Sequence, residues 1–210
     1  MNLPNKLSII RIMFIPLVLL FMLPINLFGF ETQAWNAFVM DWGRVVAGAL
    51  FIVASLTDYA DGQIARKYDL ITNLGKFLDS LADKMLVISV LVALVDVGRV
   101  SSVFVAIIVL REFAVTGIRM LASEKGVVMA AAMIGKIKTV TQMIAIIYIL
   151  FEPLFIKITM QIAPNLKTSN VQSVVANIGN VFFLISVAMT IISGLDYLIK
   201  NKHYLTQGEK

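Results

Sequence analysis

Four aspartates lie at helical spacing in a part of the chain that is otherwise rich in apolar residues. Asp58 and Asp61 are three residues apart, and Asp79 and Asp83 are four residues apart, so each pair falls on one face of a helix. An ionised carboxylate inside a bilayer costs about 3 kcal/mol, so four of them require a compensating cation. Carboxylate oxygens suit Mg²⁺ or Mn²⁺, and a chain with no Cys and one His offers little to zinc. We therefore expect the aspartates to bind one or two divalent cations.

The small residues beside these acids leave room for a ligand. Gly62 and Ala65 lie one turn apart, and Gly75 lies one turn before Asp79 on the same face, so no large side chain blocks the backbone there. The competing interpretation is that the acids form structural ion pairs with Lys or Arg, or line a proton path. Four acids interleaved with small residues at turn spacing favour a metal and substrate site over that interpretation.

A second group of polar residues follows in R-E-F-A-V-T-G-I-R and G-K-I-K-T. Arg111 and Arg119 are two turns apart on nearly one face, and Lys136 and Lys138 open the next apolar segment. A guanidinium fork fits phosphate, so we expect these four residues to form a cationic pocket for a phosphate group. The alternative is that Arg111 pairs with Glu112 while the others follow the positive-inside distribution. For Lys138 the two interpretations are equally supported.

The elements that position these residues are predicted to be membrane-spanning helices. Of the 210 residues, 59% are hydrophobic and 15% are charged, which excludes a soluble domain and predicts one all-α integral membrane domain over residues 1–210. The basic residues form no stripe with interleaved aromatic residues, which argues against nucleic-acid binding. Six apolar segments are long enough to span a bilayer at about 20 residues each, near residues 7–25, 35–58, 74–96, 100–121, 137–160 and 172–199.

The start of the chain and its basic residues predict the orientation. Pro4, Asn5 and Lys6 predict a short interfacial segment; a cleaved signal peptide is the alternative, but no small-x-small cleavage site follows the apolar run. Fourteen of the 18 Lys and Arg residues fall on one side of the predicted spans, which the positive-inside rule makes the cytoplasmic side together with both termini and the aspartates. The other side carries Arg44, Arg99, Lys157 and Lys167.

The stretch from Asp58 to Asp83 follows the pattern D-x2-D-G-x2-A-R-x8-G-x3-D-x3-D, complete at all eight fixed positions. It resembles the signature of the CDP-alcohol phosphotransferase family, whose members are membrane enzymes that displace CMP from a CDP-alcohol with a second alcohol. The resemblance implies that family's fold, two divalent ions and a homodimer. It implies that Asp83 is the general base near the metal. It further implies metal ligation by Asp58, Asp61, Asp79 and Asp83, and nucleotide or CDP-lipid binding by Asn5, Gly62, Ala65, Arg66 and Gly75.

Three further stretches, L-P-N-K-L-S-I-I-R, V-T-G-I-R and G-K-I-K-T, resemble the bacterial branch of this family that makes phosphatidylglycerophosphate. The resemblance then covers nearly the whole chain and implies CDP-diacylglycerol and sn-glycerol 3-phosphate as substrates. The basic cluster independently favours a phosphorylated acceptor. An enzyme that uses an inositol phosphate is the alternative inside the family. Outside the family, the alternative is a divalent-cation or proton-coupled transporter. The sequence shows no inverted repeat, which argues against a transporter.

Overall fold

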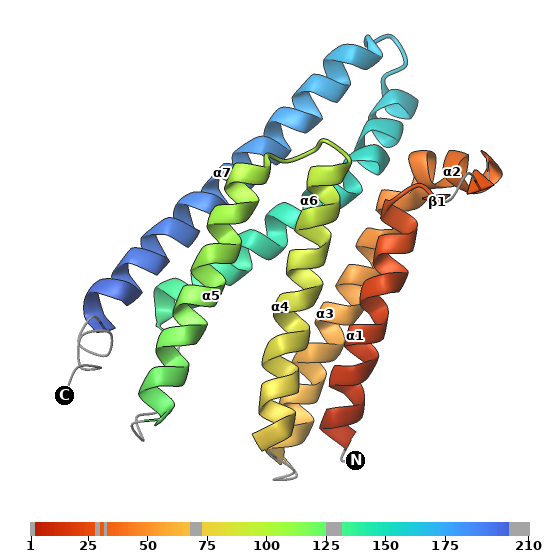
Figure 1. Ribbon diagram of the computed structural model, residues 1–210. Helices are drawn as coiled ribbons and strands as arrows, with labels where there is room; N and C mark the ends of the chain where they lie inside the picture. The colour runs from red at the N-terminus through yellow and green to blue at the C-terminus, as the bar shows by residue number, and fades with distance from the viewer. Residues whose placement is uncertain (1–2, 28–29, 32, 68–72, 125–131, 202–210) are drawn as a thin grey trace. The chain divides into compact units, whose positions relative to one another are not determined.

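The computed structural model describes the backbone of residues 3–27, 30–31, 33–67, 73–124 and 132–201, and the side chains of residues 9–25, 33–57, 81–123 and 132–201. Helices dominate this described part (Figure 1). The long ones are α1 Leu3–Met22, α3 Arg44–Lys67, α4 Asn73–Asp96, α5 Ser102–Glu124, α6 Met133–Ile162 and α7 Thr168–Asn201. Between α1 and α3 lie the short antiparallel strands β1 Asn26–Leu27 and β2 Phe30–Glu31, helix α2 Gln33–Phe38 and the π-helical turn η1 Val39–Gly43.

Each of the six apolar segments predicted from the sequence is helical. The boundary that differs most is the end of the second segment, because α3 continues past residue 58 to Lys67; the other boundaries, including the start of α1 at Leu3, differ by four residues or fewer. Pro4 therefore lies in the first turn of α1, where proline is well tolerated, and the residues around it do not form a separate segment as expected. Within the described residues, three helical stretches are long and apolar enough to cross a membrane: Gln33–Thr57, Met133–Ile162 and Thr168–Asn201. The protein is therefore an α-helical membrane protein.

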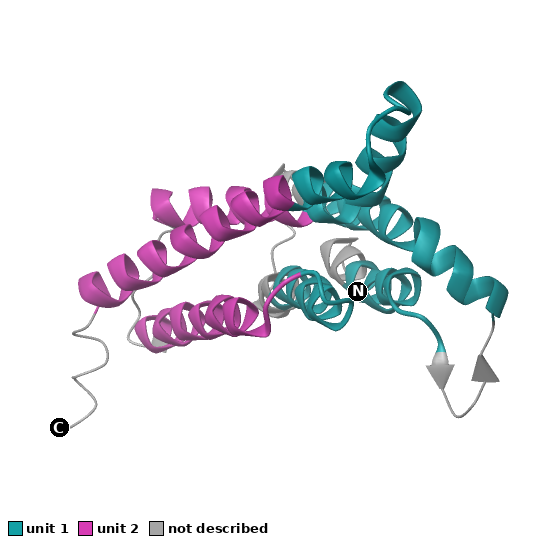
Figure 2. Cartoon of the chain, turned by 90° about the horizontal axis from the view of Figure 1, so that it is seen from above, with its two compact units in different colours: residues 1–99, 147–176 teal, residues 100–146, 177–210 magenta. Residues whose placement is uncertain are grey.

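The chain divides into two compact units, residues 1–99 with 147–176 and residues 100–146 with 177–210 (Figure 2). In the first unit, α1 packs along both α3 and α4, and the three helices run side by side (Figure 1). Apolar side chains at three- and four-residue spacing form the buried stripe of each helix. The stripe residues are Ile15, Val18 and Met22 of α1, Ala47, Phe51 and Ala54 of α3, and Leu86, Val90, Ala93 and Leu94 of α4.

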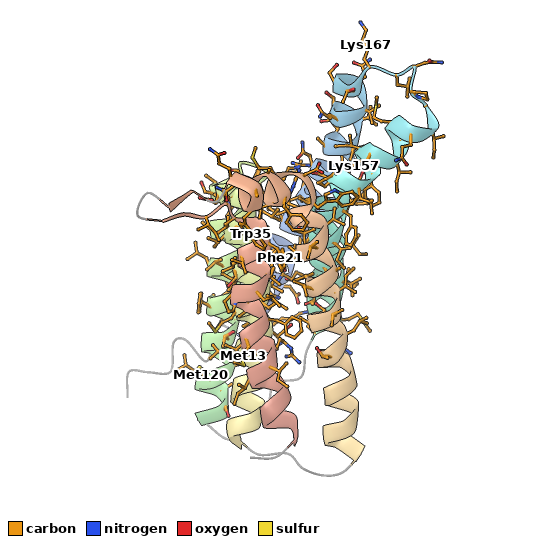
Figure 3. All side chains as sticks on the ribbon, turned by 90° about the vertical axis from the view of Figure 1, so that its right-hand side faces the viewer. Met13, Phe21, Trp35, Met120, Lys157 and Lys167 are labelled. Atoms are coloured by element: carbon orange, nitrogen blue, oxygen red, sulfur yellow. The ribbon has the colours of Figure 1, made fainter. Side chains whose placement is uncertain are left out.

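Aromatic packing and a backbone contact fix the connection between α1 and α3. The rings of Phe21 and Trp35 lie 5.4 Å apart between centroids, and Phe38 packs against both (Figure 3). The side-chain amide of Asn36 bonds the backbone of Ile25 in both directions, at 2.9 and 3.3 Å. Gly43 is buried in η1, and a Cβ there would lie 2.1 Å from the carbonyl oxygen of Phe21. Only glycine therefore permits this approach of η1 to the end of α1.

A buried carboxylate ties together the far ends of several helices in the same unit. Glu152 of α6 is 4% exposed and accepts two hydrogen bonds from Arg99, at 2.6 Å from Nε and 2.5 Å from Nη2. Arg99 also donates to the carbonyl oxygen of Ala176 in α7, and Nη1 of Arg44 lies 3.7 Å from Glu152. Bidentate arginine–carboxylate pairs combine strength with fixed geometry. This cluster joins the start of α3, the end of α4, α6 and the first turns of α7.

The second unit is built from α5, the first half of α6 and the second half of α7. Val115 and Ile118 of α5 pack with Tyr197 of α7 in a small buried cluster. Further along the same two helices, the rings of Phe104 and Phe183 meet edge to face at 6.4 Å. The unit therefore holds α5 and α7 together along much of their length.

Candidate active site

The helices α3 and α4 place the four signature aspartates in two matched pairs along the chain. Asp61 lies six residues before the end of α3 at Lys67, and Asp79 lies six residues after the start of α4 at Asn73. At 1.5 Å per residue, both positions are about 9 Å from the connection between the helices. Asp58 and Asp83 are nine and ten residues from the same connection, or about 14–15 Å. Counted from the connection, Asp61 and Asp79 therefore lie equally far along their helices, and Asp58 and Asp83 nearly so.

Most of the predicted acidic and nucleotide site falls on residues whose side chains lie outside the described part of the chain. Asp83 is described, and its side chain is exposed. The donor set is nevertheless chemically consistent with a hard divalent cation, because it consists of four carboxylates on continuous helical backbone. Among the described side chains, no three potential metal ligands gather. The predicted residues outside them are Asn5, Asp58, Asp61, Gly62, Ala65, Arg66, Gly75 and Asp79.

The structure adds Arg11 to this region, which the sequence interpretation used only to predict orientation. Arg11 is 1% exposed and lies on the same face of α1 as Ile15, Val18 and Met22, the stripe that α1 buries. That helix packs against α3 and α4, the two helices that carry the aspartates. A buried guanidinium remains charged and must be compensated. The sequence does contain a signal for this burial, because Arg11 lies four residues before Ile15 and therefore falls on the apolar face of the helix.

The predicted basic cluster is partly assembled in the second unit. Glu112 of α5 accepts a hydrogen bond from Nη1 of Arg111 at 3.0 Å and another from Nζ of Lys138 in α6. Nη2 of Arg111 donates to Oγ of Ser193 in α7 at 2.9 Å. The ion pair between Arg111 and Glu112, which the sequence offered as the alternative to phosphate binding, is therefore present. Lys138 is only 3% exposed, which a merely interfacial lysine would not be.

The other two predicted cationic residues are more accessible. The guanidinium of Arg119 lies 5.6 Å from the ring centroid of Tyr197, within the range of a cation–π contact. Arg119 and Lys136 are both exposed, unlike Arg111 and Lys138. The structure thus brings Arg111 and Lys138 together through Glu112, whereas Arg119 and Lys136 are exposed residues.

A pocket of about 240 Å³ lies between α5 and α7 in this unit, and Arg111 is its one charged lining residue. Gly194 of α7 lines it too, and a Cβ there would lie 3.0 Å from Cγ of Arg111. The absence of a side chain at residue 194 therefore lets the Arg111 stem lie against α7. The remaining lining residues are Thr190 and the apolar Leu110, Ala114, Val115, Ile191, Leu195 and Leu198.

Comparison with known proteins shows which family the chain resembles along most of its length. The chain is 39% identical to the CDP-diacylglycerol–glycerol-3-phosphate 3-phosphatidyltransferase of Bacillus subtilis, over 95% of both chains. It is 33% identical to the protein of the same name from Rickettsia bellii, over 97% of both. It is 36% identical to a probable phosphatidylglycerophosphate synthase of Mycobacterium tuberculosis, over 69% of this chain and 64% of that one. Residues 1–192 match the CDP-alcohol phosphatidyltransferase family. With its aspartate signature complete on α3 and α4, the chain belongs to the CDP-alcohol phosphatidyltransferase family.

Proposed function

We propose that this protein transfers the phosphatidyl group of CDP-diacylglycerol to sn-glycerol 3-phosphate, giving phosphatidylglycerophosphate and CMP. The observation that carries the proposal is that the complete aspartate signature lies on α3 and α4, with Asp61 and Asp79 equally far along these helices from the connection between them. The proposal of the acceptor rests on relatives named for glycerol 3-phosphate that align along 95% or more of this chain, and on the basic cluster.

The reaction is a substitution at the phosphorus atom that bears the diacylglycerol. The acceptor hydroxyl oxygen forms a new bond to this phosphorus, the pyrophosphate P–O bond breaks, and CMP leaves with the bonding electrons. Asp83 accepts the proton of the hydroxyl. Two divalent ions, Mg²⁺ or Mn²⁺, would neutralise the negative charge of the pyrophosphate when bound. Asp58, Asp61 and Asp79 would hold these ions, and Asp83 would complete the ligand set.

The nucleotide end of the substrate is assigned to small residues and one arginine of the signature. Gly62, Ala65 and Gly75 leave the backbone open beside the acids, and Arg66 contacts a nucleotide phosphate. Asn5, in the first turn of α1, reaches the nucleotide from a helix that packs against both acid-bearing helices. A lipid substrate enters such a site sideways from the bilayer, whereas a polar acceptor enters from water.

The acceptor phosphate is assigned to Arg111, Arg119, Lys136 and Lys138. Exposed cations capture the anion from water, and buried ones bind it more strongly because the local dielectric constant is lower. Arg119 and Lys136 fit the first role and Arg111 and Lys138 the second, by their exposure. An inositol phosphate would use the same cations, so it is the acceptor to test against glycerol 3-phosphate.

The proposal extends to the setting of the reaction. We propose a single membrane domain of six spans in the cytoplasmic membrane, with both termini and the aspartates on the cytoplasmic side, acting as a homodimer. Support comes from the six long helices at the predicted positions and from the fourteen basic residues assigned to one side.

CMP release by the purified protein tests the proposal. The protein is supplied with CDP-diacylglycerol, a divalent ion and one acceptor at a time: glycerol 3-phosphate, an inositol phosphate or serine. We expect release with glycerol 3-phosphate, loss of release on chelation by EDTA, and recovery with Mg²⁺ or Mn²⁺. Release only with another acceptor would overturn the choice of acceptor. No release with any acceptor from folded protein would overturn the enzymatic proposal, and ion uptake into proteoliposomes would then support a transporter.

A further inference from the structure

Glu112 holds a central place among the cations of the second unit although no role in the reaction is assigned to it. Its Oε1 accepts from Nη1 of Arg111 and from Nζ of Lys138, and thereby joins α5 to α6. Arg111 reaches on to Ser193 of α7 through Nη2, and Ser193 itself donates to the carbonyl oxygen of Thr190 at 3.3 Å. Glu112 therefore binds one cation from α5 and one from α6, and the cation from α5, Arg111, is also bonded to α7.

These bonds fix the orientation of the Arg111 guanidinium. The group is planar and presents five N–H donors in a rigid fork, so bonds from Nη1 and Nη2 to two different helices determine where its remaining donors point. Its Nε is buried and has no hydrogen-bond partner among the described residues. A buried donor without a partner is unusual and calls for an explanation. A ligand with acceptor oxygens would supply one.

The charges of the cluster point to an anion. Arg111 and Lys138 carry two positive charges beside the one negative charge of Glu112. The side chains of Arg111, Lys138 and Glu112 are 14%, 4% and 17% exposed, respectively, and water therefore screens these charges only weakly. A phosphate group offers both the negative charge and several acceptor oxygens.

We propose that Glu112 is a positioning residue for phosphorylated-acceptor binding: it holds Arg111 and Lys138 in the arrangement that receives the phosphate. This rests on the proposed function. Glu112 does not contact the phosphate, because a carboxylate would repel it. It acts by preorganising two flexible cations, so that less conformational entropy is lost when the acceptor binds.

A purely structural carboxylate would behave differently, and the chain offers a matched control. Glu152, like Glu112, is a carboxylate in an α-helix with two cationic neighbours, but it is more fully buried and lies in the other unit. Glu152→Gln should lower the thermal midpoint without a selective effect on the acceptor. Asp196→Asn removes an i,i+4 pair with Lys200 on α7. This variant controls for the loss of one carboxylate charge in the unit that contains Glu112.

The experiment measures KM for each substrate, kcat and the thermal midpoint of Glu112→Gln, Glu112→Asp and the two control variants. KM is measured for whichever phosphorylated acceptor supports CMP release. We expect Glu112→Gln to raise the KM of that acceptor about 10- to 100-fold, and Glu112→Asp, which keeps the charge on a shorter stem, to raise it less. The KM for CDP-diacylglycerol should stay within about twofold. The double variant Glu112→Gln/Lys138→Met should be less impaired than the product of its single variants, because the two residues act as a unit.

Equal changes in both KM values, or a fall in thermal midpoint with no change in acceptor KM, would overturn the proposal. If Glu112→Gln does not fold, the same comparison of the acceptor KM with the CDP-diacylglycerol KM is made with Glu112→Asp. The proposed function is tested independently of Glu112: it is wrong if the unaltered protein releases no CMP. Calorimetric titration with inorganic phosphate then decides about Glu112: weaker phosphate binding in the variants than in the unaltered protein supports positioning, and equal binding overturns it.

Discussion

Asp83 differs from the other signature aspartates because its proposed role is to accept a proton as well as to sit near metal. We expect Asp83→Asn to reduce kcat by at least about 1,000-fold, since an amide cannot act as a general base. CDP-diacylglycerol binding should persist, because three carboxylates remain to hold the cations. Turnover by stopped-flow CMP release and lipid binding by equilibrium titration measure the two effects. A variant with near-normal turnover would remove Asp83 from the role of base.

Arg119 is one of the two exposed cations proposed to bind the acceptor phosphate, together with Lys136. Its guanidinium lies over the ring of Tyr197 and its side chain is exposed. We expect Arg119→Ala to raise the KM of glycerol 3-phosphate about 10- to 100-fold and that of CDP-diacylglycerol much less. Arg119→Lys should recover part of the loss, since it keeps the charge but not the fork. Parallel increases in both KM values would assign Arg119 to packing against Tyr197 instead.

Residue types and spacing predicted the aspartate signature because those residues are close in the chain. The partners of the cations were not predictable in the same way. Glu112 was foreseen only as a neighbour of Arg111, and its bond to Lys138 depends on how α6 meets α5. The pairing of Glu152 with Arg99 joins residues 53 positions apart. Sequence periodicity carries no information about such tertiary contacts, which only the packing of helices decides.

The helices themselves were largely predictable, because long apolar runs leave a membrane chain few other options. All six expected segments are helical. The end of the second was placed too early, at Asp58, because polar residues follow it. In the structure, α3 continues to Lys67, since helical hydrogen bonding does not require an apolar sequence. The turn η1 and helix α2 were missed as separate elements, because their residues continue the apolar pattern of the predicted second span.

The close approach of η1 to α1 gives a prediction at the scale of elements. Gly43→Ala would place its Cβ 2.1 Å from a backbone oxygen, which cannot move as a side chain could. We expect a lower thermal midpoint in detergent and a loss of about 1–3 kcal/mol of stability. Gly117→Ala is the matched control: nothing lies within 4 Å of its Cβ, and alanine favours a helix by about 1 kcal/mol. If both variants unfold at the same temperature, the contact between η1 and α1 is looser than the structure describes.

At the scale of the molecule, the basic residues distribute unevenly between the two sides of the predicted spans. All four residues assigned to the less basic side lie in one unit, and three of them, Arg44, Arg99 and Lys157, pair with carboxylates there. Arg44 and Arg99 meet at Glu152, and Lys157 lies 2.7 Å from Asp41 and over the ring of Trp42. Arg44 and Arg99 lie at the start of α3 and just after the end of α4, the ends farthest from the connection near the aspartates. This arrangement agrees with their assignment to the side opposite the aspartates.

The absence of cysteine from the chain makes this orientation directly testable. Single cysteines introduced at Lys167 and at Ser123, both exposed, should fall on opposite sides of the membrane. A membrane-impermeant maleimide should label Lys167→Cys in intact cells, and Ser123→Cys only after the membrane is opened. The unaltered protein, which contains no thiol, is the control for background labelling. The reverse pattern would place the aspartates outside the cell and would overturn the proposed orientation. Because the positive-inside rule depends on where Lys and Arg lie and little on acidic residues, neutralising Glu152 should leave the labelling pattern unchanged.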